Sequence, residues 1–148
     1  MKRINEYIIV YYSMSKTKVK RGKKKQKKEE KIDYHKLFKP NVGPKSVFRK
    51  GAFGGTYFRT IDSGITGKTH HGKTAIREYP DDWFKGFDIE KRVISSKYDK
   101  KVNKYGVKCG SSLEDWENND WIINQDPYGW FQWNCRYSLG RRSKDDER

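Results

Sequence analysis

The sequence is short of the aliphatic residues that fill most protein cores, and this shortage limits how it can fold. Only 33% of its 148 residues are hydrophobic, whereas 15% are aromatic. A buried aromatic side chain removes roughly 150–250 Å² of surface from water, so a few rings can close the core of one small domain. All five tryptophans lie between Trp83 and Trp133. We therefore predict an ordered region with an aromatic core in that part of the chain.

Cysteine is scarce too, and long hydrophobic runs are missing. Cys109 and Cys135 are too few for a disulfide scaffold, so two reduced, buried thiols are favoured over one disulfide between them. The apolar stretch 7–12 has six residues, whereas a membrane-spanning helix needs about 20. A lysine-rich segment follows it in place of a signal-peptide cleavage site. The sequence predicts an intracellular protein that is neither secreted nor inserted in a membrane.

Acidic residues are outnumbered, and the excess of positive charge is concentrated. The formal net charge is +15, and residues 16–31 alone hold ten Lys or Arg and two Glu, a net charge of +8. Such a run repels itself open and cannot be buried. It attracts phosphates through counterion release, without reading sequence. We predict a basic, mostly disordered leader over residues 1–45. Its predicted nucleic-acid contacts are Lys18, Lys20, Arg21, Lys23, Lys24, Lys25, Lys27 and Lys28.

The chain changes character after this leader. Gly51–Gly55 marks tight backbone. Thr56–Ile61 is rich in β-branched and aromatic residues, which favours a short strand, and Asp62–Gly64 is typical of a turn. We predict one small α+β domain over residues 46–148, with short helices, an aromatic core and one glycine-rich β element.

Helix signals concentrate after residue 78. Pro80–Gly86 has proline at its start, acids next and glycine at its end, which predicts one or two helical turns. Asp88 is placed to cap a second short helix, and Ser111 with Glu114 has the spacing of a capping box. Asp126–Gly140 is predicted as the longest helix.

This long helix is predicted to bury an aromatic face, defined by residues at i, i+3, i+4 and i+7 and their neighbours. The residues of that face are Trp130, Phe131, Trp133, Asn134, Cys135, Tyr137 and Ser138. Gln132 and Arg136 are predicted to lie on the opposite side.

Two short patterns come near to known ligand-binding motifs, and neither is complete. Gly64–Thr69 lacks the first glycine of a phosphate-binding loop, since Asp62 occupies that position, and a polar turn is favoured. Four side chains could together ligate a metal, but they lack the usual C-x₂-C or H-x₃-H spacing. They are His70, His71, Cys109 and Cys135. We predict neither a metal nor a cofactor.

A third pattern fits a loose nuclease signature. In such sites two acids hold Mg²⁺ and a lysine steadies the attacking water, and here Asp81, Asp99 and Lys101 would take those roles. The acids of such sites lie on adjacent strands, whereas Asp81 belongs to a predicted helix start. A metal-dependent nuclease is therefore kept as an alternative, and no residue is predicted to be catalytic.

Basic and aromatic residues alternate in the second half of the chain. Lys104, Lys108, Arg136, Arg141 and Arg142 are interleaved with Tyr105, Trp121, Tyr128 and Tyr137. A surface of this composition suits single strands and nucleic-acid backbones, although such rings more often belong to a core. We predict that these five basic residues join the leader in binding nucleic acid.

Two motifs distinguish this half further. One is NKYGVKCGSSLEDWE at 103–117, and the other is DPYGWFQWNCRY at 126–137, followed by LGRR at 139–142 and DDER at 145–148. With residues 51–59, they resemble a family without an assigned activity that occurs in fungi, plants or algae, and large DNA viruses of protists. The resemblance covers roughly residues 46–148 and implies no particular activity, cofactor or fold.

The resemblance has three implications. The basic leader lies outside the shared region. Asn134 stands where similar sequences usually carry an aromatic residue. Similar proteins continue beyond the motif at 145–148 into another basic, tryptophan-containing segment, so this chain is expected to be a shortened member.

We expect a non-enzymatic protein that associates with DNA or RNA, in which the leader supplies affinity and the domain some specificity. A viral member would suit a packaging or chromatin-like role in a nucleus, a viral factory or a virion. The first alternative is a protein-interaction or virion structural component that uses a tryptophan-rich surface, and the second is the nuclease.

Overall fold

The computed structural model describes residues 33–108 and 110–147. These residues fall into two compact units, one comprising Pro40–Arg141 and the other comprising the described residues among 1–39 and 142–148. The eight leader residues predicted to bind nucleic acid, and the greater part of the predicted disordered leader, lie among residues 1–32 and so outside the described residues.

The smaller unit contains two short helical segments. α2 spans Tyr34–Leu37, and the 3₁₀ helix η3 spans Lys144–Glu147. The main-chain N–H of Ser143 donates to Asp146 Oδ2 at 2.8 Å, which closes the turn at the start of η3. Arg142 belongs to this unit, whereas the four other basic residues predicted from the second half of the chain belong to the larger one.

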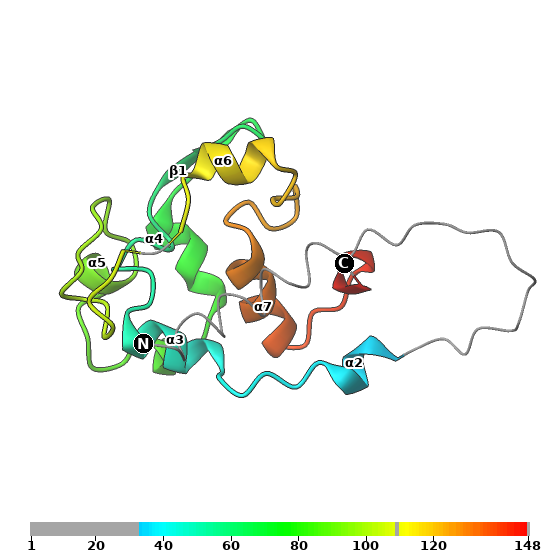
Figure 1. Ribbon diagram of the computed structural model, residues 1–148, viewed down its shortest axis with the longest axis horizontal. Coiled ribbons are helices and arrows are strands. Elements are labelled where there is room, and N and C mark those ends of the chain that lie inside the picture. Colours follow the sequence, from blue (N-terminus) through cyan, green and yellow to red (C-terminus); the bar gives the residue numbers. More distant parts are fainter. Residues whose placement is uncertain (1–32, 109, 148) are drawn as a thin grey trace, which may run out of the picture. The chain divides into compact units, whose positions relative to one another are not determined.

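Short helices and one hairpin make up the larger unit (Figure 1). The helices are α3 (Pro44–Lys50), α4 (Gly72–Ala75), η1 (Ile76–Glu78), η2 (Asp81–Trp83), α5 (Ile89–Arg92), α6 (Leu113–Asn118) and α7 (Trp130–Ser138). β1 (Ile61–Ser63) pairs antiparallel with β2 (Lys68–His70), in a register that sets Ile61 opposite His70. Helices with one small sheet agree with the predicted α+β class.

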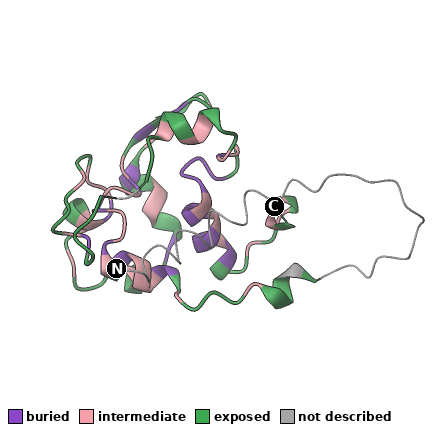
Figure 2. Ribbon diagram, viewed as in Figure 1, coloured by how far each residue is buried: buried purple, intermediate pink, exposed green. Residues whose placement is uncertain are grey.

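Aromatic rings form the core of this unit, as the composition predicts. The buried rings are Phe48, Phe58, Tyr79, Phe84, Tyr128 and Phe131. Phe58 is fully buried, and its ring centroid lies 5.0 Å from that of Tyr128 and 5.3 Å from that of Tyr79. The five tryptophans are only partly buried. Figure 2 shows buried residues concentrated on α7 and on the segment that leads into it.

The predicted strand Thr56–Ile61 is wrong in position. Residues 51–55 form turns, the strand begins only at Ile61, and the turn expected at Asp62–Gly64 starts at Gly64. Thr56 N–H donates to Phe53 O at 3.1 Å, which is a turn contact rather than a ladder bond. The side chains explain the difference, because the rings of Phe53, Tyr57 and Phe58 lie in contact with core rings and pull this segment into the core.

The predicted boundaries of two helices are also wrong. α6 is capped by Ser112, whose Oγ accepts from Asp115 N–H at 3.1 Å, while Asp115 Oδ2 accepts from Ser112 N–H at 3.2 Å. The capping box therefore lies one residue beyond Ser111 and Glu114. α7 begins at Trp130, after Gly129 with φ 94°, because Asp126 is buried in ion pairs rather than exposed as a cap.

The predicted faces of the long helix need one exchange. Phe131, Asn134, Cys135 and Tyr137 are buried, as expected. The prediction that Gln132 lies on the exposed side is wrong, because this residue is only 2% exposed. The prediction that Ser138 lies on the buried face is also wrong, because this residue is exposed. The main-chain N–H of Tyr128 donates to Gln132 Oε1 at 3.0 Å, so a polar contact at the start of the helix draws this side chain inward.

Other local predictions are confirmed. Asp88 Oδ1 accepts from the N–H groups of Glu90 and Lys91, which caps α5. Pro80 precedes the helical turn η2, and residues 64–67 form the turn between β1 and β2. These positions carry local signals that need no tertiary contact.

Candidate functional site

Charge is distributed unevenly over the larger unit. Residues 85–108 hold eight Lys or Arg and three Asp or Glu, a net charge of +5, and Arg49 and Lys50 add two more positive charges. Residues 110–141 hold five acids and two arginines, a net charge of −3. We define the basic lobe as residues 85–108 with Arg49 and Lys50, and the acidic segment as residues 110–141.

Backbone hydrogen bonds attach the basic lobe to the rest of the unit. Three main-chain N–H groups donate across this junction at 2.9–3.0 Å, Phe58 to Val93, Ser95 to Gly55 and Asp99 to Gly54. A fourth bond, from Lys104 N–H to Lys50 O at 2.8 Å, joins two parts of the lobe itself. These bonds hold the lobe through main-chain groups, which do not depend on the identity of the side chains.

Two glycines permit this close approach. A Cβ at Gly55 would lie 2.0 Å from Lys91 O, and a Cβ at Gly51 would lie 2.0 Å from Val102 O. Both residues also have positive φ, +87° and +59°, a conformation that strains residues with a side chain. The absence of side chains at these two glycines therefore allows α5 and the loop that follows it to pack closely against the glycine-rich turn.

A buried asparagine closes the loop 98–108. Asn103 is 4% exposed. Its Nδ2 lies 2.8 Å from Val107 O and 3.0 Å from the hydroxyl oxygen of Tyr98, and its Oδ1 accepts from Tyr105 N–H at 2.9 Å. Nδ2 also lies 3.3 Å from Ala52 O. One side chain thus ties both arms of the loop together and to the glycine-rich turn.

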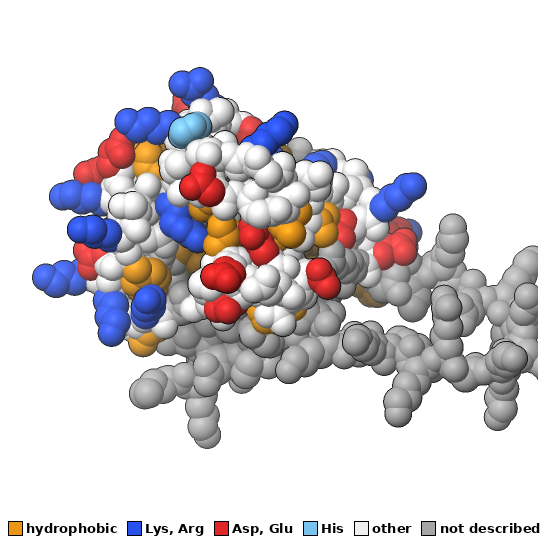
Figure 3. Space-filling model, turned by 90° about the horizontal axis from the view of Figure 1, so that it is seen from above, with side chains coloured by type: hydrophobic (Ala, Val, Ile, Leu, Met, Phe, Trp, Pro, Cys, Tyr) orange, Lys and Arg blue, Asp and Glu red, His pale blue; other side chains and the backbone are white. Residues whose placement is uncertain are grey.

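The lysines of the basic lobe are directed to solvent. Seven of its eight lysines are exposed, and the eighth, Lys50 on α3, is partly buried. The exposed ones are Lys85, Lys91, Lys97, Lys100, Lys101, Lys104 and Lys108. Figure 3 shows Lys and Arg side chains gathered at the left end of the face drawn, where Figure 1 places α5 and the loop after it. The lobe therefore presents a positively charged surface.

In the acidic segment, by contrast, the arginines are engaged internally. Asp126 is 2% exposed, and its carboxylate takes a two-bonded contact from Arg141, with Nη1 at 2.6 Å and Nη2 at 2.7 Å. Arg136 Nη1 lies 2.9 Å from Asp126 Oδ1, and Arg136 also makes a two-bonded contact with Glu78 at 2.9 and 2.8 Å. We define Glu78, Asp126, Arg136 and Arg141 as the ion-pair network.

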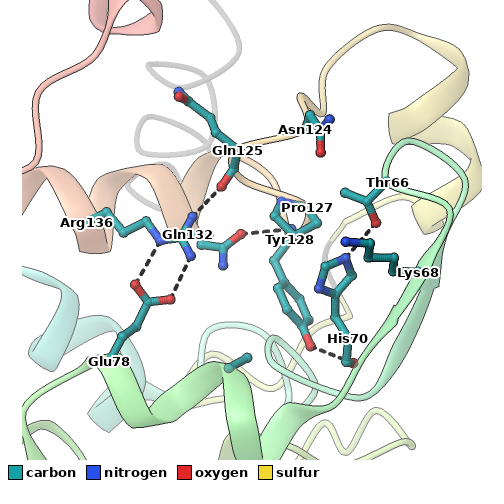
Figure 4. Close-up of a pocket in the computed structure, with 11 residues that line it drawn as sticks. Thr66, Lys68, His70, Glu78, Asn124, Gln125, Pro127, Tyr128, Gln132 and Arg136 are labelled. Carbon is teal, nitrogen blue, oxygen red and sulfur yellow. Dashed lines mark hydrogen bonds and ion pairs between the residues drawn. The ribbon is translucent and has the colours of Figure 1, made fainter.

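A polar pocket of about 340 Å³ lies beside the ion-pair network (Figure 4). The hairpin supplies one wall, with Thr66, Lys68 and His70, and Glu78 and Arg136 face each other across another part of it. The remaining lining residues are Ala75, Asn124, Gln125, Pro127, Tyr128 and Gln132. Tyr128 donates its hydroxyl to His70 O at 3.1 Å, and Thr66 Oγ1 lies 2.7 Å from His70 Nε2.

Burial and charge shift the pKa values of several side chains at this pocket or near it. Burial raises the pKa of Tyr128 to about 12, so its hydroxyl stays protonated and acts as a donor. Burial also raises the pKa of the Cys135 thiol well above its usual range. For Arg136 burial acts to lower the pKa, but the hydrogen bonds and charge of Glu78 outweigh it and the pKa is raised. The Tyr128 hydroxyl and the Cys135 thiol therefore stay protonated near neutral pH.

A partly buried tyrosine that the sequence analysis missed organises the start of α7. Tyr57 donates its hydroxyl to Tyr128 O at 2.9 Å and accepts from Gln132 N–H at 2.7 Å. Burial raises its pKa well above the usual value. No sequence signal near Tyr57 identifies this role, because its partners lie more than 70 positions away along the chain.

The structure separates the basic residues predicted from the second half of the chain. Lys104 and Lys108 lie in the basic lobe, whereas Arg136 and Arg141 belong to the ion-pair network. Of the interleaved aromatics, Tyr105 is exposed, Tyr128 and Tyr137 are buried, and Trp121 packs edge-on against Trp116. The prediction missed Lys91, Lys97 and Lys100 as neighbours of Lys104, although the excess of lysine over residues 85–108 was a usable signal.

Two further patterns in the sequence concern a metal site and a nuclease. Within residues 33–108 and 110–147, no group of three or more His, Cys, Asp or Glu side chains is placed to hold a metal ion. Cys109, a potential zinc ligand, lies outside these residues. Asp99, from the nuclease pattern, accepts from Lys101 N–H at 2.8 Å and so shapes a turn. Over the same residues, no helix has the length and apolar character needed to cross a bilayer.

Comparisons of the chain with protein-family models, with curated proteins and with solved structures gave no significant match.

Proposed function

We propose that the protein binds nucleic acid through its phosphates, with the basic lobe as the docking surface of the folded unit. The observation that carries this proposal is the separation of charge, since the lobe's lysines are exposed while the acidic segment's arginines are engaged internally. Lysine neutralises phosphates as a point charge and releases condensed counterions when it does so.

The basic leader, residues 16–31, adds a net charge of +8 to the same chain. A leader of this kind supplies affinity without sequence preference. The lobe differs from the leader because its lysines are carried on a backbone that is fixed by hydrogen bonds. The carbonyl oxygens of Gly54, Gly55 and Lys50 accept these bonds. We assign affinity to the leader and orientation of the nucleic acid to the lobe.

The first alternative, a protein-binding role for a tryptophan-rich surface, has less support. All five tryptophans are partly buried, and four of them pack against neighbouring rings, Trp83 on Tyr79, Trp133 on Tyr137, and Trp116 and Trp121 on each other. The exposed positions of the larger unit are instead rich in lysine. For these reasons the phosphate-binding function is preferred.

Fluorescence anisotropy with a labelled oligonucleotide, measured across a salt series, tests the proposal. The variant neutralises four lobe lysines, as Lys97→Gln, Lys100→Gln, Lys101→Gln and Lys104→Gln. The matched control neutralises four exposed cations outside the lobe, as Lys36→Gln, Lys39→Gln, Lys68→Gln and Arg77→Gln. We expect the lobe variant to reduce the slope of log K against log salt by roughly 2–3 units, since each lost contact with a single strand removes about 0.7.

The control variant should keep most of that slope. Equal losses in the two variants would mean that only total charge matters, and the lobe would then have no special role. Deleting residues 1–31 should weaken binding strongly in either background. Tight binding of a protein partner that persists at high salt would favour the first alternative instead.

A further inference from the structure

We propose that the loop 98–108 is a stacking site for an unpaired base, which makes single-stranded nucleic acid the ligand class of the basic lobe. This inference rests on the proposed function and specifies its ligand. The residue that would contact the base is Tyr105. This residue is 40% exposed, which makes it the most exposed Phe, Tyr or Trp among those whose burial the structure describes.

The exposure of Tyr105 is a product of a well-supported backbone. Asn103 Oδ1 accepts from the main-chain N–H of Tyr105, and Asn103 O accepts from that of Gly106 at 2.9 Å. The other end of the loop is held where Tyr98 donates its hydroxyl to Val107 O at 2.7 Å. With both sides of the loop fixed, the backbone that carries Tyr105 has little conformational entropy left to lose on binding.

The surroundings of the ring match what a single strand offers. Lys104 and Lys108 are exposed on either side of Tyr105 in the sequence, and Val107, 43% exposed, adds apolar surface beside it. Aromatic rings stack on bases of any sequence, and each such contact is lost on replacement by alanine with a measurable drop in affinity. Lysines on both sides can reach the phosphates that flank the stacked base.

A duplex offers this ring no comparable partner. Its bases are stacked on one another, and they must be unpaired or flipped out before a side chain can lie against their faces. A duplex would therefore contact the lobe through phosphates alone. The geometry predicts that Tyr105 contributes to binding of single strands and contributes little to binding of duplexes.

Binding of a mixed-sequence oligonucleotide, as single strand and as duplex and in DNA and RNA form, tests this assignment on the full chain. Tyr105→Ala should weaken single-strand binding by roughly 5- to 100-fold, the range expected for loss of one stacked base. Duplex binding should change by less than about 2-fold. Tyr105→Trp, which keeps a stacking face, should retain single-strand affinity, whereas Tyr105→Leu should not.

Thermal melting of each variant guards against a folding artefact, because Tyr105 is exposed and its replacement should leave the melting temperature unchanged. If Tyr105→Ala lowers single-strand and duplex affinity alike, or changes neither, the stacking site is refuted. A different result refutes the proposed function, namely an equal reduction in the slope of log K against log salt for the four-lysine lobe variant and its control. The two ideas can therefore be judged independently.

Discussion

In the acidic segment two arginines turn inward to one buried carboxylate, whereas in the basic lobe the lysines turn outward and the backbone holds the structure. The first arrangement uses charge to stabilise the fold, because Asp126 accepts from both Arg136 and Arg141. The second leaves its charge on the surface. Both regions contain basic residues, but only in the basic lobe do most of them face solvent. The number of basic residues in a segment therefore does not show which of them can bind a ligand.

A large loss of stability is expected when the buried carboxylate of the ion-pair network, Asp126, is replaced. Asp126→Asn removes the charge that faces Arg136 and Arg141, whose side chains are 23% and 26% exposed. Loss of one partner of a fully buried ion pair costs about 3–5 kcal/mol, and partial exposure of the arginines reduces this to roughly 2–4 kcal/mol. Urea denaturation measures the change in the free energy of unfolding.

Glu114→Gln is the control for this change, because Glu114 is an exposed acid of the same segment. Its effect should stay within about 0.5 kcal/mol. Under conditions where both variants are folded, their salt dependence of nucleic-acid binding should equal that of the unaltered chain. A cost below about 1 kcal/mol for Asp126→Asn would show that the ion-pair network does not stabilise the fold.

A similarly large loss of stability is expected where the basic lobe packs against the glycine-rich turn. Gly55→Ala places a Cβ 2.0 Å from Lys91 O at a residue with φ +87°. Backbone strain and overpacking each cost about 1–3 kcal/mol, so a combined loss of roughly 2–6 kcal/mol is expected. Hydrogen exchange should show weaker protection of the Ser95 amide, which donates to Gly55 O.

Gly86→Ala isolates the contribution of contact. Gly86 has the same φ of +87°, but a Cβ there would meet nothing within 4 Å. This variant should therefore show only the strain of the backbone, about 1 kcal/mol. Equal losses at the two glycines would mean that close packing against α5 is unimportant for seating the lobe.

The smallest loss of stability is expected at the N-terminal cap of α6, where it distinguishes a cap at Ser112 from the predicted cap at Ser111. Ser112→Ala removes the Oγ that accepts from Asp115 N–H, and loss of such a cap costs about 1 kcal/mol. Ser111→Ala should change the free energy of unfolding by less than about 0.5 kcal/mol. Chemical denaturation of both variants is the measurement, and the opposite order would restore the register centred on Ser111 and Glu114.

The sequence was informative where structure depends on neighbouring residues. The cap at Asp88, the turn after Pro80 and the aromatic core all follow from composition or from spacing over a few positions. The register of α6 could not be chosen, since Ser111 and Ser112 each have an acid three residues later. Local patterns there allow two solutions, and only packing selects one.

The errors arise where distant residues decide the outcome. Asp126 has the spacing of a helix cap, but its role depends on Arg136 and Arg141 turning toward it. The strand predicted at Thr56–Ile61 has suitable residues, yet contacts of Tyr57 and Phe131 bend that segment into the core. For the candidate interface, the lysines of the lobe were visible in the sequence, but the role of Asn103 in closing their loop was not.

The contrast between the two regions extends to the time course of folding. Asp126 meets Arg136 and Arg141 across 10 and 15 positions, whereas Asn103 reaches Ala52 across 51. Closing a longer loop costs more entropy, and chains with more distant contacts fold more slowly. We expect the contacts of Asp126 with Arg136 and Arg141 to form early in refolding. The loop 98–108 should close early as well, through its own short-range bonds, and dock on the glycine-rich turn later, so the orientation of the lobe should be recovered after its local structure.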